Sequence, residues 1–328
     1  MKAIKTLAMA ALATAVFASC SSEDELAQNN YPMDNVVRIM TSVDGMNTRA
    51  SYGNSTDKLS SFGFCINNAG NTKYTYDNIK VTKEGRNWIP ATQMLWQNST
   101  TAVDILAYAP YQETTEDATG KVKIFGKTDY AFSVQADQSD AEDYSSDLIV
   151  FKQTGFKPGT ELNTSKAVDV KFTHLLSQLN LTIELRDQFN TNNNTVTKGF
   201  VTDVKVNGTI ISSKVDFSAS PISVQVDGTQ AAAITPETTG FTPAENATAH
   251  AVFNYSAIVI PQTVAAGNFS ISFKVDGTEY IWTATDAVTF ESGKKHELHL
   301  LAGKDVVQGG AISAKPWGEE TITEKETD

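Results

Sequence analysis

Apolar and polar residues alternate with a period of two along most of the chain from Val36 onward. The first such run places apolar side chains at Val37, Ile39 and Val43. This period is typical of strands that bury one face, whereas amphipathic helices repeat every 3.6 residues. The sequence shows no long stretch with the helical period and no regular alternation of strands with helices. The pattern therefore predicts an all-β fold of antiparallel sandwiches.

Three Asn-Gly or Asp-Gly pairs lie beside alternating runs, at 207–208, 227–228 and 276–277. Both residue pairs favour the positive φ angles that a two-residue hairpin turn requires. We therefore expect a β-hairpin at each of these three positions.

The face that carries the apolar residues changes within 168–185. Even-numbered positions are apolar from Val168 to Phe172, and odd-numbered positions are apolar from Leu179. In one continuous strand this change would move the buried side chains to the opposite face. The segment 174–177 therefore contains either a bulge in one long strand or a passage from one sandwich to another.

The second alternative fits the length of the chain, because about 150 residues on each side is a common domain size. We expect an N-terminal sandwich over 36–175 and a C-terminal sandwich with an acidic tail over 176–328.

The composition of the chain excludes some classes of protein and of partner. The chain has 328 residues, 41% of them hydrophobic and 20% charged, which is ordinary for a folded protein. The formal net charge of −12 disfavours nucleic acid as a partner, because an acidic surface repels phosphates. Two cysteines, Cys20 and Cys65, are too few for a disulfide scaffold.

The N-terminus has the pattern of an export signal. Two lysines precede an apolar run from Leu7 to Ala18, which is shorter than the ~20 residues of a membrane-spanning helix. The small residues before Cys20 resemble a bacterial lipobox, which implies cleavage after residue 19 and lipidation of Cys20. The alternative is a plain signal peptide with an incidental cysteine. Residues 20–35 then form a polar tether.

Catalytic and metal-binding patterns are absent from the sequence. His296 and His299 lie three apart, so in a strand their rings point to opposite faces and do not share a metal ion. His174 lies at the change of parity, where we expect a buried hydrogen bond. The acidic residues of 137–147 lack a calcium-loop pattern and indicate a solvated loop. We therefore expect no enzyme, no cofactor and no metal site.

Several segments together resemble the fimbrillin-like proteins of Bacteroidetes, the subunits and relatives of type V pili. The resemblance covers nearly all of the chain after the signal. Its pieces are the cysteine at position 20, Thr48–Ala50, Asp104–Tyr111, Asp147–Phe151, Phe172–Ile183, Ala257–Val264, Tyr280–Ala284, Phe290–Leu300 and Ile312–Trp317. The resemblance implies two tandem transthyretin-like antiparallel β-sandwich domains. It also implies a surface-exposed lipoprotein of the outer membrane.

The resemblance further implies assembly after proteolysis. A trypsin-like surface protease would cut between Arg49 and Ala50, in a polar segment that should be accessible. The cut would remove the first strand, with Val37, Ile39 and Val43, and a strand from another fimbrial subunit would fill the groove.

The C-terminal tail departs from this expectation. Residues 318–328 are rich in acidic side chains and contain only one apolar residue, Ile322, whereas a donor strand should alternate apolar residues. A shorter donor within 311–317 would contain Pro316, which limits its pairing. A shaft, anchor, tip or accessory role therefore stays open. The alternative function is a stand-alone surface lipoprotein that binds glycans or other ligands.

Overall fold

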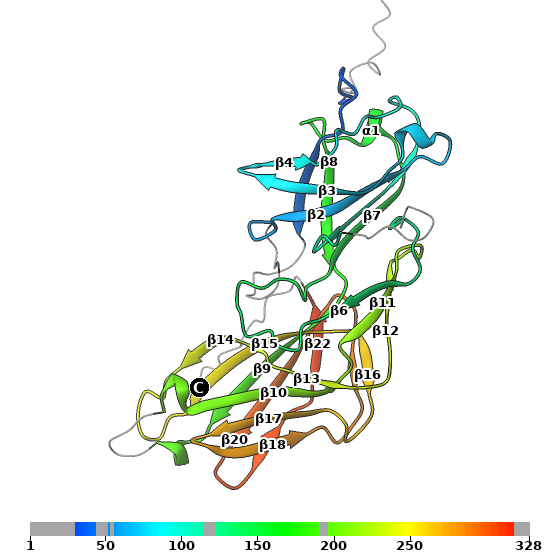
Figure 1. Ribbon diagram of the computed structural model, residues 1–328. Coiled ribbons are helices and arrows are strands. Elements are labelled where there is room, and N and C mark those ends of the chain that lie inside the picture. Colours follow the sequence, from blue (N-terminus) through cyan, green and yellow to red (C-terminus); the bar gives the residue numbers. More distant parts are fainter. Residues whose placement is uncertain (1–29, 44–51, 53–55, 114–122, 191–195, 318–328) are drawn as a thin grey trace, which may run out of the picture.

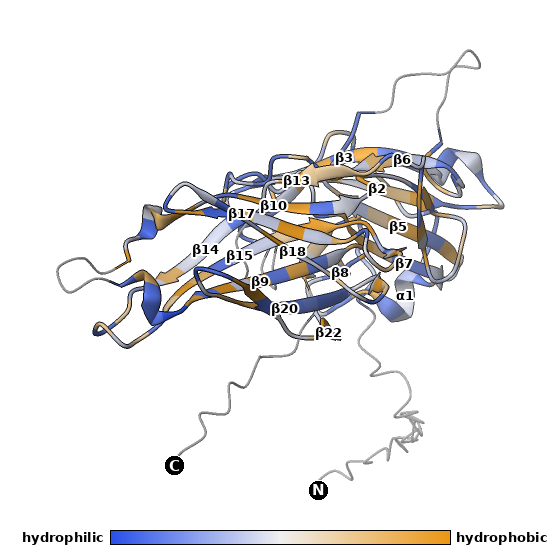
Figure 2. Cartoon of the chain, turned by 90° about the horizontal axis from the view of Figure 1, so that it is seen from below, coloured by the Kyte–Doolittle hydropathy of each residue, from blue (hydrophilic) through white to orange (hydrophobic). Residues whose placement is uncertain are grey.

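The computed structural model describes residues 30–43, 52, 56–113, 123–190 and 196–317 (Figure 1). Their helices are single turns: α1 (Pro158–Glu161) and the 3-10 helices η2 (Thr72–Tyr74), η3 (Asp187–Phe189) and η4 (Lys198–Phe200). Almost all other regular structure is strand, so the prediction of an all-β protein is confirmed. Apolar and polar residues alternate along the strands (Figure 2).

The strands follow in chain order. They are β1 (Ile39–Val43), β2 (Ser61–Asn67), β3 (Tyr76–Glu84), β4 (Asn87–Pro90), β5 (Val103–Ala109), β6 (Tyr130–Ser133), β7 (Ile149–Phe156), β8 (Val168–His174), β9 (Ser177–Leu185), β10 (Val201–Thr209), β11 (Ser212–Asp216), β12 (Ser223–Val226), β13 (Ala232–Ile234), β14 (Glu237–Thr242), β15 (Ala251–Val259), β16 (Gln262–Val264), β17 (Ser270–Val275), β18 (Thr278–Thr283), β19 (Val288–Phe290), β20 (Lys294–Ala302), β21 (Val307–Gly309) and β22 (Ser313–Pro316).

A seven-stranded sheet forms the first unit, in the order β1-β8-β7-β5-β2-β3-β4. Its core contains the ring of Phe62, which packs edge to face against two other rings. The centroid distances are 5.0 Å to Trp88 and 5.4 Å to Phe172. The edge strands β1 and β4 both line one cavity, so the sheet curls until its two edges face each other.

The second unit stacks several sheets below the first (Figure 1). The largest has the order β14-β15-β9-β20-β21, with β22 also paired to β20. A four-stranded sheet has the order β13-β10-β17-β18. Leu181 and Ile183 of β9 lie in one buried cluster with Ile271 and Phe273 of β17. The two sheets therefore pack face to face, as in a sandwich.

The chain changes sheets where the parity of its apolar residues changes. β8 ends at His174 in the seven-stranded sheet, and β9 begins at Ser177 in the largest sheet of the second unit. One continuous strand with a bulge is therefore the wrong alternative. The domain boundary at residue 175 stays a prediction, since β6 lies upstream of it and yet pairs with β11.

Of the three expected hairpins, one forms. Asp276 and Gly277 join β17 to β18 with positive φ angles of 48° and 80°. Asn207-Gly208 instead lies within β10, where the register with β13 shifts. The prediction at 227–228 is also wrong, because β12 and β13 belong to different sheets.

Candidate functional site

The first strand fills the core with one face. Val37, Ile39 and Val43 are 2%, 6% and 5% exposed, whereas Met40 on the other face is 48% exposed. Burial of alternate apolar side chains removes them from water and is the main favourable contribution to docking such a strand.

The backbone of this segment is paired differently along its length. Upstream of β1, the Val37 amide donates to the Met94 carbonyl at 3.0 Å. Within β1, Ile39–Val43 pair in parallel with Val168–Phe172 of β8. β1 has no other partner strand among the described residues. It is therefore an edge strand that can leave without breaking a sheet in the middle.

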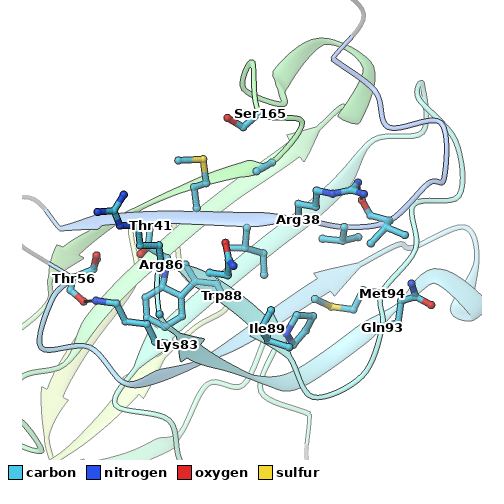
Figure 3. Close-up of a pocket in the computed structure, with 18 of the residues that line it drawn as sticks. Arg38, Thr41, Thr56, Lys83, Arg86, Trp88, Ile89, Gln93, Met94 and Ser165 are labelled. Carbon is cyan, nitrogen blue, oxygen red and sulfur yellow. Dashed lines mark hydrogen bonds between the residues drawn. The ribbon is translucent and has the colours of Figure 1, made fainter.

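A cavity of about 870 Å³ opens between β1 and β4 (Figure 3). Trp88 and Ile89 of β4 line it opposite Arg38 and Thr41. Lys83 donates to the Thr56 carbonyl at 2.9 Å and lies 5.8 Å from the Trp88 ring. The cavity thus has apolar walls and basic groups, between two sheet edges that can accept an extended chain.

The predicted lipidation and cleavage residues, Cys20, Arg49 and Ala50, lie outside the described residues. Tyr52, three residues after Arg49, is described and is 6% exposed. Its amide donates to Oδ2 of Asp147 at 2.8 Å, and its ring stacks on Tyr144 with centroids 5.5 Å apart. Burial, with the nearby Asp147 charge, raises the pKa of Tyr52. The chain is therefore anchored shortly after the predicted cut.

Asp147 also binds the histidine at the sheet change. Its Oδ1 lies 2.9 Å from Nδ1 of His174, and both side chains are completely buried. The His174 ring stacks on Trp317, with centroids 3.9 Å apart and planes 6° from parallel. The expected buried hydrogen bond of His174 is confirmed. No local pattern of residues indicated the partners of His174, because they are distant along the chain.

The other histidines follow the strand geometry. His296 is 1% exposed and accepts from the Glu291 amide through Nε2, whereas His299 lies on the opposite face, 2.7 Å from Glu184. His250 bonds the second oxygen of Glu184. Sequence analysis missed this His-Glu-His group, because its members come together only through the pairing of β15, β9 and β20.

The acidic residues of 137–147 do not converge on one point. Asp137, Asp140 and Asp143 each accept from the amide two residues further on, at 2.9 to 3.0 Å. These are local turns of the backbone. In the described part of the chain, no three His, Cys, Asp or Glu residues are grouped so that they would hold a metal ion. Cys65 is buried as a free thiol.

No helix within the described ranges has both the length and the hydrophobicity to cross a membrane.

The fimbrillin-like family matches residues 48–317. This match covers most of the chain, so the protein belongs to the fimbrillin-like family, and its membership supports a fimbrial or adhesin role at the cell surface. Comparison with curated proteins gives no match.

Solved structures share the fold. A candidate cell adhesion protein from Bacteroides ovatus matches with a TM-score of 0.62 and 14% identity, over 87% of this chain and 99% of its own. One from Bacteroides uniformis matches with a TM-score of 0.56 and 18% identity, over 87% and 100%. A fimbrial protein from Bacteroides vulgatus matches with a TM-score of 0.50 and 17% identity, over 86% and 99%.

Proposed function

We propose that this chain is the precursor of a fimbrial subunit or accessory adhesin that assembles by protease-gated strand exchange. A trypsin-like surface protease cuts after Arg49, β1 leaves, and a strand from another fimbrial subunit takes its place. The observation that carries this proposal is the position of β1, an edge strand whose Ile39 and Val43 fill the core together with Val37 just upstream. The family match begins at residue 48, downstream of β1.

Removal of β1 prepares the subunit to pair with a strand of another chain. It exposes one edge of β8 and the apolar surface that Val37, Ile39 and Val43 covered. An unpaired edge beside an apolar groove is unfavourable in water and favours pairing with another extended chain. The anchored Tyr52 keeps the start of the remaining chain in place.

Export and anchoring precede this step in our proposal. The signal over 1–19 directs export, and lipidated Cys20 holds the precursor in the outer membrane. Because Cys20 lies upstream of Arg49, cleavage also separates the body from its anchor. We propose that the two units are transthyretin-like sandwich domains that meet near residue 175. A Cys20→Ala variant should be released from membranes, and its retention would contradict the anchor.

The test of strand exchange is polymer formation after exposure to the native surface protease or to trypsin. Wild type should form high-mass, detergent-stable polymers, and Arg49→Ala should stay monomeric. Arg186→Ala, a matched change in the second unit, should polymerise like wild type. If wild type and Arg49→Ala polymerise equally, or neither does, the protein is instead a fixed accessory or ligand-binding surface lipoprotein.

A further inference from the structure

Tyr52 and Trp317, the first and last described residues downstream of the predicted cut, meet at one buried hydrogen-bonded pair, Asp147 and His174. Tyr52 is held by Oδ2 of Asp147, and Oδ1 of Asp147 holds His174. The His174 ring in turn stacks on the ring of Trp317, which is 4% exposed. Trp317 directly follows β22, so residues far apart in sequence are fixed by a single Asp–His pair.

The strand that carries His174 depends on β1. Val168–Phe172 of β8 pair with β1, whereas β7 pairs with β8 only at Thr173 and His174. When β1 leaves, most of β8 loses its only partner strand among the described residues. The buried side chains of β8 then pack beside the space that β1 vacated, so the strand that ends at His174 becomes less constrained.

The turn after His174 is fastened to Ser292 and Gly293, directly before β20, and β22 pairs with the start of β20. Ser292 donates to the Leu175 carbonyl at 2.6 Å, and the Gly293 amide donates to the Leu176 carbonyl at 2.9 Å. β22 pairs with β20 from Lys294↔Pro316 to Glu297↔Ser313. A shift of the His174 turn therefore reaches β22 by two routes, through the Trp317 ring and through Ser292 and Gly293 into β20.

We propose that docking of β1 and docking of β22 are coupled through β8 and the Asp147–His174–Trp317 cluster. While β1 is paired, His174 is held against Trp317 and β22 stays on β20. Release of β1 loosens β8, weakens the stacking on Trp317 and raises the population of molecules with β22 detached. This inference rests on the proposed function for its biological use, because strand removal is the step that would trigger it. The coupling itself requires no protease.

The coupling can be measured by amide hydrogen exchange on the uncleaved full chain. Val43→Asp places a charge on the buried face of β1, and Met40→Asp places the same charge on its exposed face. Val43→Asp should speed exchange in residues 39–43. It should also speed exchange in 312–317 by about tenfold, a factor within the usual range of coupling between two sites. Met40→Asp should change neither segment. Exchange in 270–283, on β17 and β18, should stay at the wild-type rate in both variants.

Reciprocity supplies the second measurement, because coupling must act equally in both directions. Trp317→Leu removes the ring that stacks on His174 and should speed exchange in 39–43, whereas Trp282→Leu should not. If Val43→Asp unfolds the protein, Val43→Ala takes its place. The inference is overturned if exchange rises in 39–43 and stays at the wild-type rate in 312–317. That result would leave protease-gated assembly intact, and failure of Arg49-dependent polymerisation would leave the coupling intact.

Discussion

Burial sets the chemistry of the histidines at the scale of single residues. His296 and His299 are neighbours on β20, yet one faces the core and the other faces solvent beside Glu184. Burial lowers the pKa of His296, opposed by the charge of Glu291 and aided by that of Lys294. The Nε2 atom of His296 accepts a hydrogen bond from the Glu291 amide, which requires that nitrogen to be unprotonated.

The lowered pKa of His296 predicts a pH dependence of stability. Below the unfolded value of about 6.5, the unfolded chain binds a proton that the buried ring does not, so the free energy of unfolding should rise with pH up to that value. Urea denaturation at pH 5 and pH 7 should show this rise in wild type and a smaller rise in His296→Gln. An equal pH dependence in wild type and His296→Gln would contradict the prediction.

At the scale of elements, alternation of apolar residues located the strands because burial of one face imposes a period of two. The turn at 276–277 was predictable because its requirement is local, a pair of residues with positive φ. Gly208 has a positive φ of 94° for another reason, since its backbone lies against the carbonyl of Asn268. An Asn-Gly pair in a sequence can therefore mark either a hairpin turn or close contact with a backbone segment that is distant along the chain.

The close approach at Gly208 predicts a large effect of a single methyl group. A Cβ there would lie 2.0 Å from the Asn268 oxygen, far inside contact distance. Gly208→Ala should therefore lower the free energy of unfolding by roughly 2 kcal/mol or more, through strain and a forced shift of β10. Gly228→Ala is the matched control, since φ is 103° there and no atom lies within 4 Å. Similar losses in the two variants would show that strain, not contact with Asn268, dominates.

At the scale of the whole molecule, the two units are joined by contacts that the sequence does not reveal. The Lys152 ammonium on β7 donates to the carbonyls of Phe217, Ser218 and Ala219, at 2.8 to 2.9 Å. Beside it, the ring centroids of Tyr108 and Phe217 lie 5.6 Å apart. This junction fixes the first sheet against the loop between β11 and β12.

Lys152 should therefore stabilise the folded protein through its three hydrogen bonds to carbonyl oxygens. Lys152→Met keeps an unbranched side chain, one atom shorter, and leaves those oxygens without their donor, at a cost of about 1–3 kcal/mol. Thermal and urea unfolding should both show the loss. Lys171→Met, at a largely exposed lysine, should stay within about 0.5 kcal/mol of wild type. Equal stability of the two variants would show that Lys152 does not stabilise the junction.

The candidate site shows the same limit of sequence reasoning. Val37, Ile39 and Val43 could be assigned to one buried face because their spacing is local. The meeting of Tyr52, Asp147, His174 and Trp317 could not, because it depends on how β7, β8 and the end of the chain pack in space. Cleavage between Arg49 and Ala50 remains a prediction from the family resemblance and from the polar segment around these residues.

The meeting of Tyr52 and Trp317 at the Asp147–His174 pair has a consequence for chain topology. Tyr52 and Trp317, the first and last described residues downstream of the predicted cut, lie at neighbouring points of the fold. A short linker between these points would allow the body to start at another surface loop with the same strands and the same pairing. We therefore expect that the order of the strands along the polypeptide can be changed in this way without changing their pairing in space.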